Sequence, residues 1–150
     1  MLWKRDVGNY MYPFPNAINN YFGFLNEYGF SILEKEEINT SAMGNGYYRF
    51  MSETTGIEIA LDRGQVLMVI GKSQQDRKDW LEWSIILEAY APDIKAYDFE
   101  IDIDSQVRRI SELLKQYCAK LLEGDFSDEI LLNVIEDKIG KGFRESFLQS

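Results

Sequence analysis

The sequence predicts one α+β domain over residues 1–150, with an N-terminal helix, an antiparallel meander of four to five strands, and two to three C-terminal helices packed on one face of the sheet. Three observations predict this fold. Apolar and polar residues alternate over 57–62, as in a half-buried strand, between apolar-rich segments at 47–51 and 65–71. Apolar residues recur at helical spacing over 17–28 and 107–121. The length of 150 residues, 45% of them hydrophobic, suffices for one core.

The N-terminal helix is expected to follow an extended arm. Pro13 and Pro15 favour an extended path, so residues 1–15 are predicted to form the arm. Asn16 is a suitable N-cap residue, and the apolar side chains after it fall on one face of a helix. Gly29 suits the left-handed position that closes such a helix.

The meander is expected to contain strands at 47–51, 57–62 and 65–71, after a short strand at Phe30 and Ile32. The strand at 65–71 is apolar on both faces, so it is predicted to lie inside the sheet. Two C-terminal helices should then cover the sheet. They are predicted over 105–121 and 127–139.

An acidic strand is predicted at the edge of the sheet, over residues 97–104, where apolar side chains alternate with four acids. These acids are Asp98, Glu100, Asp102 and Asp104. Their spacing is similar to that of a calcium-binding loop, but Ile103 stands where such a loop needs glycine. We therefore expect a solvated strand face, and the four acids are candidate partner-binding residues.

Residues 79–91 are predicted to form a helix, because Trp80, Trp83, Leu87 and Tyr90 fall on one face. Tryptophan side chains anchor many protein interfaces, so Trp80 and Trp83 are further candidates for partner binding. Aromatic residues at helical spacing are also common in protein cores. The sequence leaves both interpretations open.

The composition excludes several kinds of catalytic and metal site. The chain has no histidine and one cysteine, Cys118, so Ser-His and Cys-His nucleophiles and structural zinc sites cannot be built. No cofactor-binding, metal-binding or catalytic residue is therefore assigned. A hydrolase that uses two carboxylates remains an alternative, because 25 acids bring some pair close together in any fold.

The net charge is −9, from 16 basic and 25 acidic residues, and it favours basic protein partners while nucleic acid would be repelled. No apolar segment typical of a signal peptide follows Lys4, and no apolar run is long enough to cross a membrane. Together with the single cysteine, these features predict a soluble protein of the cytoplasm.

Short motifs within residues 16–90 resemble those of a family of small bacterial proteins. The motifs are Tyr21–Phe30, Tyr48–Ser52, Ile59–Val66 and the segment with Trp80 and Trp83, with a later likeness at Cys118–Phe126. In this family a helix ending in Tyr-Gly-Phe precedes a short meander around Asp-Arg-Gly-Gln, which stands here at residues 62–65. Such families are similar to the immunity proteins encoded beside polymorphic or contact-dependent toxins.

The resemblance implies a non-enzymatic protein that binds a cognate toxin domain and so protects the producing cell. It implies no catalytic residue. The acidic charge adds the expectation that the toxin domain is basic. Alternatives are an adaptor protein or an inhibitor that mimics nucleic acid. At residues 62–65 the turn itself explains the motif, because Gly64 permits a positive φ and Asp62 can hydrogen-bond the local backbone.

Overall fold

The computed structural model describes residues 13–37 and 45–139. Its centre is an antiparallel sheet of five strands in the order β1-β2-β3-β4-β5. The strands are β1 (Ser31–Glu37), β2 (Gly46–Met51), β3 (Thr55–Asp62), β4 (Gln65–Lys72) and β5 (Leu81–Glu82). Strands that are consecutive in the chain are neighbours in the sheet, so the predicted meander and the α+β class are confirmed.

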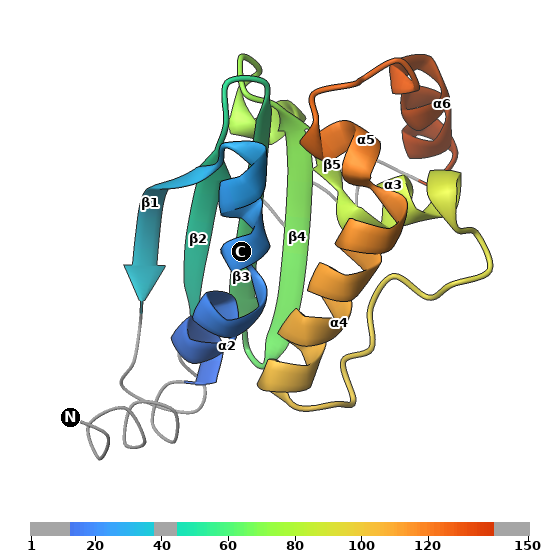
Figure 1. Ribbon diagram of the computed structural model, residues 1–150. Coiled ribbons are helices and arrows are strands. Elements are labelled where there is room, and N and C mark those ends of the chain that lie inside the picture. Colours follow the sequence, from blue (N-terminus) through green and yellow to red (C-terminus); the bar gives the residue numbers. More distant parts are fainter. Residues whose placement is uncertain (1–12, 38–44, 140–150) are drawn as a thin grey trace.

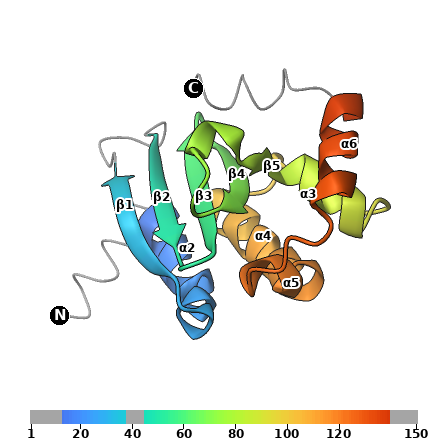
Figure 2. The ribbon, with the colours of Figure 1, turned by 90° about the horizontal axis from the view of Figure 1, so that it is seen from above.

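The helices are α2 (Pro13–Tyr21), α3 (Trp83–Tyr90), α4 (Ile103–Tyr117), α5 (Ala119–Leu122) and α6 (Glu129–Ile139). Two 3-10 turns, η1 (Gly23–Tyr28) and η2 (Arg77–Asp79), complete the described elements. Helices α2 and α4 lie side by side on one face of the sheet, and α3 packs against α6 beyond the β5 edge (Figures 1 and 2). No helix within the described ranges combines the length and apolar character needed to cross a bilayer.

The core lies between the sheet and the pair α2 and α4. Every second residue of the three central strands points into it, as the period of a strand dictates. Its buried residues include Tyr48, Phe50, Ile57, Ile59, Val66, Met68 and Ile70 from the sheet, and Phe14, Ile18, Val107, Ile110 and Leu114 from the helices. Full burial of such a side chain stabilises the fold by about 1.5–3 kcal/mol.

The N-terminal helix begins earlier than the sequence indicated, so the prediction of an extended arm is wrong for residues 13–15. Pro13 and Pro15 lie in the first turn of α2, where a backbone N–H has no helical partner and proline is tolerated. Phe14 is buried against Tyr48, with 5.6 Å between ring centroids. Residues 1–12, the rest of the predicted arm, lie outside the described residues.

The helix predicted over 79–91 begins only at Trp83, because β5 comes first. Glu82 determines the start: its Oε2 accepts the N–H of Ser84 at 2.7 Å and so caps α3. The spacing of Trp80 and Trp83 fits one helix face, but Trp80 precedes the helix and packs on the sheet instead.

The prediction of a strand over 97–104 is also wrong, because the fifth strand of the sheet is β5. Residues 97–102 form a loop, and α4 starts at Ile103 with Asp102 as its N-cap. Aspartate side chains in this loop bond nearby backbone N–H groups, which competes with pairing to a sheet. The alternation of apolar and acidic residues therefore reflects local capping and one buried ring, Tyr97.

The two edges of the sheet differ. At one edge β5 has only two residues, and α3 follows it directly. At the other, β1 is seven residues long, and its residues 31–36 are all exposed. A bulge interrupts the pairing of β1 with β2 between Ile32 and Glu34.

Candidate functional site

The predicted acidic residues lie in the loop before α4 and in the first turn of that helix. The carboxylate of Asp98 accepts the N–H of Glu100 at 3.1 Å, and Asp102 accepts the N–H of Ser105 at 2.7 Å. Asp104 accepts the hydroxyl of Tyr21 at 2.9 Å and so ties α4 to α2. Three of the four acids therefore hold local structure, while Glu100 is exposed.

The two predicted tryptophans are not at the surface. Trp80 and Trp83 expose 1% and 0% of their area, and each indole N–H donates to a backbone carbonyl. The acceptors are Lys72 O at 3.0 Å and Ala96 O at 3.1 Å. The core interpretation of these residues is confirmed, and neither side chain can contact a partner without unfolding.

A better candidate lies on the face of the sheet opposite α2 and α4, which we name the open sheet face. Strand register places Glu34, Arg49 and Glu58 in a first row and Glu36, Tyr47, Ala60 and Leu67 in a second, with Asp62 beyond the second row. Within the described ranges no α-helix covers this face, and only the segment that carries η2 crosses it, over β3 and β4 (Figure 2).

A charged network occupies the first of these rows. The carboxylate of Glu58 is only 2% exposed and accepts from Arg49 Nε and Nη2 at 3.0 and 2.9 Å. From the η2 segment, Arg77 Nε donates to the same carboxylate at 2.6 Å, and Arg77 Nη2 also binds it. Arg49 Nη1 reaches Glu34 at 3.3 Å. Because a carboxylate buried alone would be costly, the hydrogen bonds from the two guanidinium groups offset the burial of the Glu58 side chain.

In the second row, the side chain of Tyr47 is held by Glu34 of the first row. The Tyr47 hydroxyl donates to Glu34, and this hydrogen bond raises the pKa of Tyr47. Arg49 Cζ lies 5.7 Å from the centroid of the Tyr47 ring. The ring therefore has a fixed orientation at the margin of the face.

Beside this network lies a concave site of about 340 Å³, which we name the sheet hollow. It is lined by Glu36, Asn45, Gly46, Tyr47, Glu58, Ala60, Leu61, Asp62, Leu67 and Arg77. Ala60 and Leu67 are paired across β3 and β4 and give it an apolar floor, and Glu36 and Asp62 add carboxylates. This mixture of apolar surface and a few polar groups is typical of a binding site.

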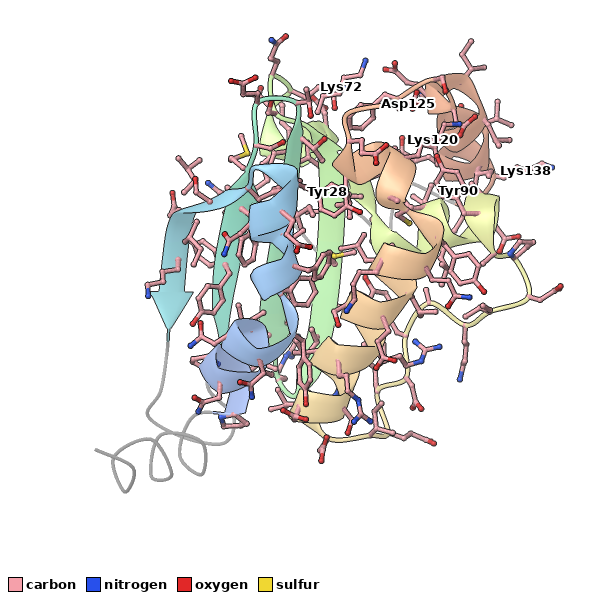
Figure 3. The ribbon with its side chains drawn as sticks, in the orientation of Figure 1. Tyr28, Lys72, Tyr90, Lys120, Asp125 and Lys138 are labelled. Atoms are coloured by element: carbon pink, nitrogen blue, oxygen red, sulfur yellow. The ribbon has the colours of Figure 1, made fainter. Side chains whose placement is uncertain are left out.

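Helix α6 offers a second surface of a different kind. The start of α6 is fixed by ionic contacts: Lys72 binds Glu129 at 2.7 Å, and Lys120 binds Asp128, the residue before the helix, at 2.8 Å. Figure 3 labels Lys72 and Lys120. Tyr90 also donates to Asp128, at 3.0 Å. From its first turn onward the helix exposes a set of apolar side chains. They are Ile130, Leu131, Val134 and Ile139.

Metal binding has no support in the described part of the chain. No group of three or more Asp, Glu or Cys side chains there is placed to hold an ion. The thiol of Cys118 is buried in the core, which raises its pKa to about 12 and leaves it protonated at neutral pH.

Comparison with protein-family models, with curated proteins and with solved structures gave no match. The resemblance to immunity proteins therefore rests on short motifs, and those motifs have structural roles here. In Tyr21–Phe30, which joins α2 to β1, the apolar side chains Phe22 and Leu25 are buried. At the β3–β4 turn, Arg63 and Gly64 have φ of 51° and 83°, and Asn45 rather than Asp62 accepts the N–H of Arg63.

The sequence predicted helices on one face of the sheet, which leaves the other face to solvent or a partner, but it did not indicate which residues occupy that face. Arg49 and Glu58 are outward-facing polar residues of two predicted strands joined by a short turn, so their pairing could have been inferred. Arg77 gave no such signal, because it comes from the irregular segment after β4.

Proposed function

We propose that this chain is a non-enzymatic protein-binding domain that acts in the cytoplasm as an immunity protein, neutralising a basic toxin domain. The observation that carries the proposal is the open sheet face, an antiparallel face without a helical layer in the described structure. It combines Tyr47 and Arg49, types enriched in interface centres, with a concave site.

Charge supports a basic partner. Gln106 Nε2 donates to Gly64 O at 2.9 Å and to Ile101 O at 3.0 Å, which joins the β3–β4 turn to the acidic loop. Asp62, which lines the sheet hollow, and the acidic loop before α4 consequently lie towards the same end of the molecule. An acidic surface of this extent would raise the association rate of a basic protein.

The proposal is tested with the tagged full-length chain as bait in extract of its native cell. We expect one stoichiometric protein to be retained, and the purified bait to abolish that protein's toxic activity in a dose-dependent assay. Co-expression should protect cells from it. If retained proteins lack toxic activity, or keep it when saturated with this chain, the immunity proposal fails. Competition by DNA for the retained protein would instead favour an inhibitor that mimics nucleic acid.

A further inference from the structure

We propose that the sheet hollow receives one basic side chain, an arginine or lysine, of the protein partner. This inference deepens the proposed function and rests on it for the identity of the partner as a protein. It assigns a chemical class of ligand to one site on the open sheet face.

The distribution of charge around the hollow favours a cation. Both guanidinium groups near it, Arg49 and Arg77, are already bound to the buried carboxylate of Glu58. Glu36 makes no hydrogen bond or ion pair within the described structure. Asp62 has a side chain only 16% exposed, and its one ion pair is with Arg63, which is 76% exposed. An entering cation therefore meets two carboxylates and competes only with an exposed, weak ion pair, whereas the guanidinium groups of Arg49 and Arg77 are already bound.

The shape and lining of the hollow favour a long side chain over a bare ion. Ala60 and Leu67 form an apolar floor, and the Tyr47 ring stands beside it. The aliphatic part of lysine or arginine packs on such a surface while its charged end remains with the acids. Guanidinium and ammonium groups both form short hydrogen bonds to carboxylates.

The hollow is held in shape before any partner arrives. Tyr47 is fixed through its hydrogen bond to Glu34, and Glu58 is fixed by two arginines. Asn45 holds the turn next to Asp62 by accepting the N–H of Arg63 at 3.0 Å. A site that is already ordered loses little entropy on binding, so even an isolated side-chain analogue should bind measurably.

The test uses the full chain and N-acetyl-arginine amide as the probe, with N-acetyl-citrulline amide as the uncharged analogue of the same shape. Methyl resonances of Ala60 and Leu67 are followed by NMR during titration. We expect saturable shifts with the arginine compound and none with the citrulline compound. Glu36→Gln and Asp62→Asn should each weaken the apparent affinity about fivefold, as expected for a partly exposed ion pair.

The matched control is Glu112→Gln, which removes one exposed charge from α4, outside the hollow lining. It should leave the titration unchanged, and thermal unfolding curves verify that all three variants are folded. Equal shifts with citrulline, no shifts with arginine, or equal weakening by Glu112→Gln would each overturn the inference. Because the probe is a small molecule, the titration tests the hollow even if the immunity proposal fails.

Discussion

Trp80 packs so closely on the sheet that the two residues beneath its indole ring have to be glycine. Gly56 and Gly71 face each other across β3 and β4, and the indole covers both. A Cβ atom added at Gly56 would lie 2.2 Å from the indole, and one added at Gly71 would lie 2.5 Å from it. The indole N–H is fixed to Lys72 O, so the ring has little freedom to move aside.

We expect Gly56→Ala to lower the free energy of unfolding by about 1–3 kcal/mol, the usual cost of an overpacked core. Gly23→Ala is the matched control, because no heavy atom lies within 4 Å of a Cβ added there. Chemical denaturation of both variants measures the difference. Equal stabilities of the two variants would contradict the close approach of Trp80 to the sheet.

Glu82 is a buried acid whose charge costs stability. It is fully buried at the start of α3, and burial raises its pKa while hydrogen bonds from Tyr97 and Ser84 oppose that rise. The folded state therefore binds the proton more tightly than the unfolded state. As the pH falls through the folded pKa towards the ordinary value, stability increases; as the pH rises, stability is lost.

Glu82→Gln removes this dependence and keeps an oxygen that can accept the Ser84 N–H. We expect the variant to be more stable than the natural chain near pH 7, with the advantage disappearing towards about pH 4, below the ordinary glutamate pKa. Unfolding free energies measured across this range test it. An advantage that grows towards low pH would show that the sign is wrong.

At the scale of elements, α4 depends on its cap. Asp102 accepts the N–H of Ser105, and this hydrogen bond lowers the pKa of Asp102. The contribution of the ionised carboxylate to stability is therefore present above the ordinary aspartate pKa. It is lost as the pH falls through the lowered pKa of the folded state. Asp102→Ala should cost about 1 kcal/mol of unfolding free energy, and Asp102→Asn much less, because asparagine also caps helices. Chemical denaturation at neutral pH measures the unfolding free energy of both variants. Equal losses would mean that charge, and not capping, is what the helix needs.

The elements that sequence predicted well are those whose pattern has one physical cause. Residues 57–62 alternate because Ile57, Ile59 and Leu61 point into the core, and the two-residue turn at Arg63 and Gly64 fixes the register. Residues 97–104 alternate for mixed reasons, with a buried Tyr97 and aspartates that cap local backbone, so a strand was inferred where a loop stands.

The site was less predictable than the fold. Glu36 lines the same hollow as Asp62 only because β1 pairs with β2 past a bulge, and a shift of one residue would turn Glu36 to the other face. Arg77 reaches Glu58 from a segment without periodicity, across 19 positions of sequence. Long-range contacts of this kind leave no local signal.

For the whole molecule, the net charge of −9 should govern how fast a basic partner is found. Raising the salt concentration from about 0.1 M to about 1 M shortens the Debye length from about 10 Å to about 3 Å. We expect the association rate to fall steeply over this range and the dissociation rate to change less. Stopped-flow or surface-binding kinetics with the retained partner protein measure both rates. An association rate independent of salt would exclude electrostatic steering.

The long open edge at β1 bears on the concentration at which this protein can be handled. Unpaired backbone groups along an exposed strand can pair with another copy, and charged side chains and bulges are common defences against such fibre-like association. β1 carries both, in Glu34, Lys35, Glu36 and the bulge after Ile32. Neutralising Glu36 weakens that defence, whereas Asp62 lies on the interior strand β3 and can be neutralised without altering the edge.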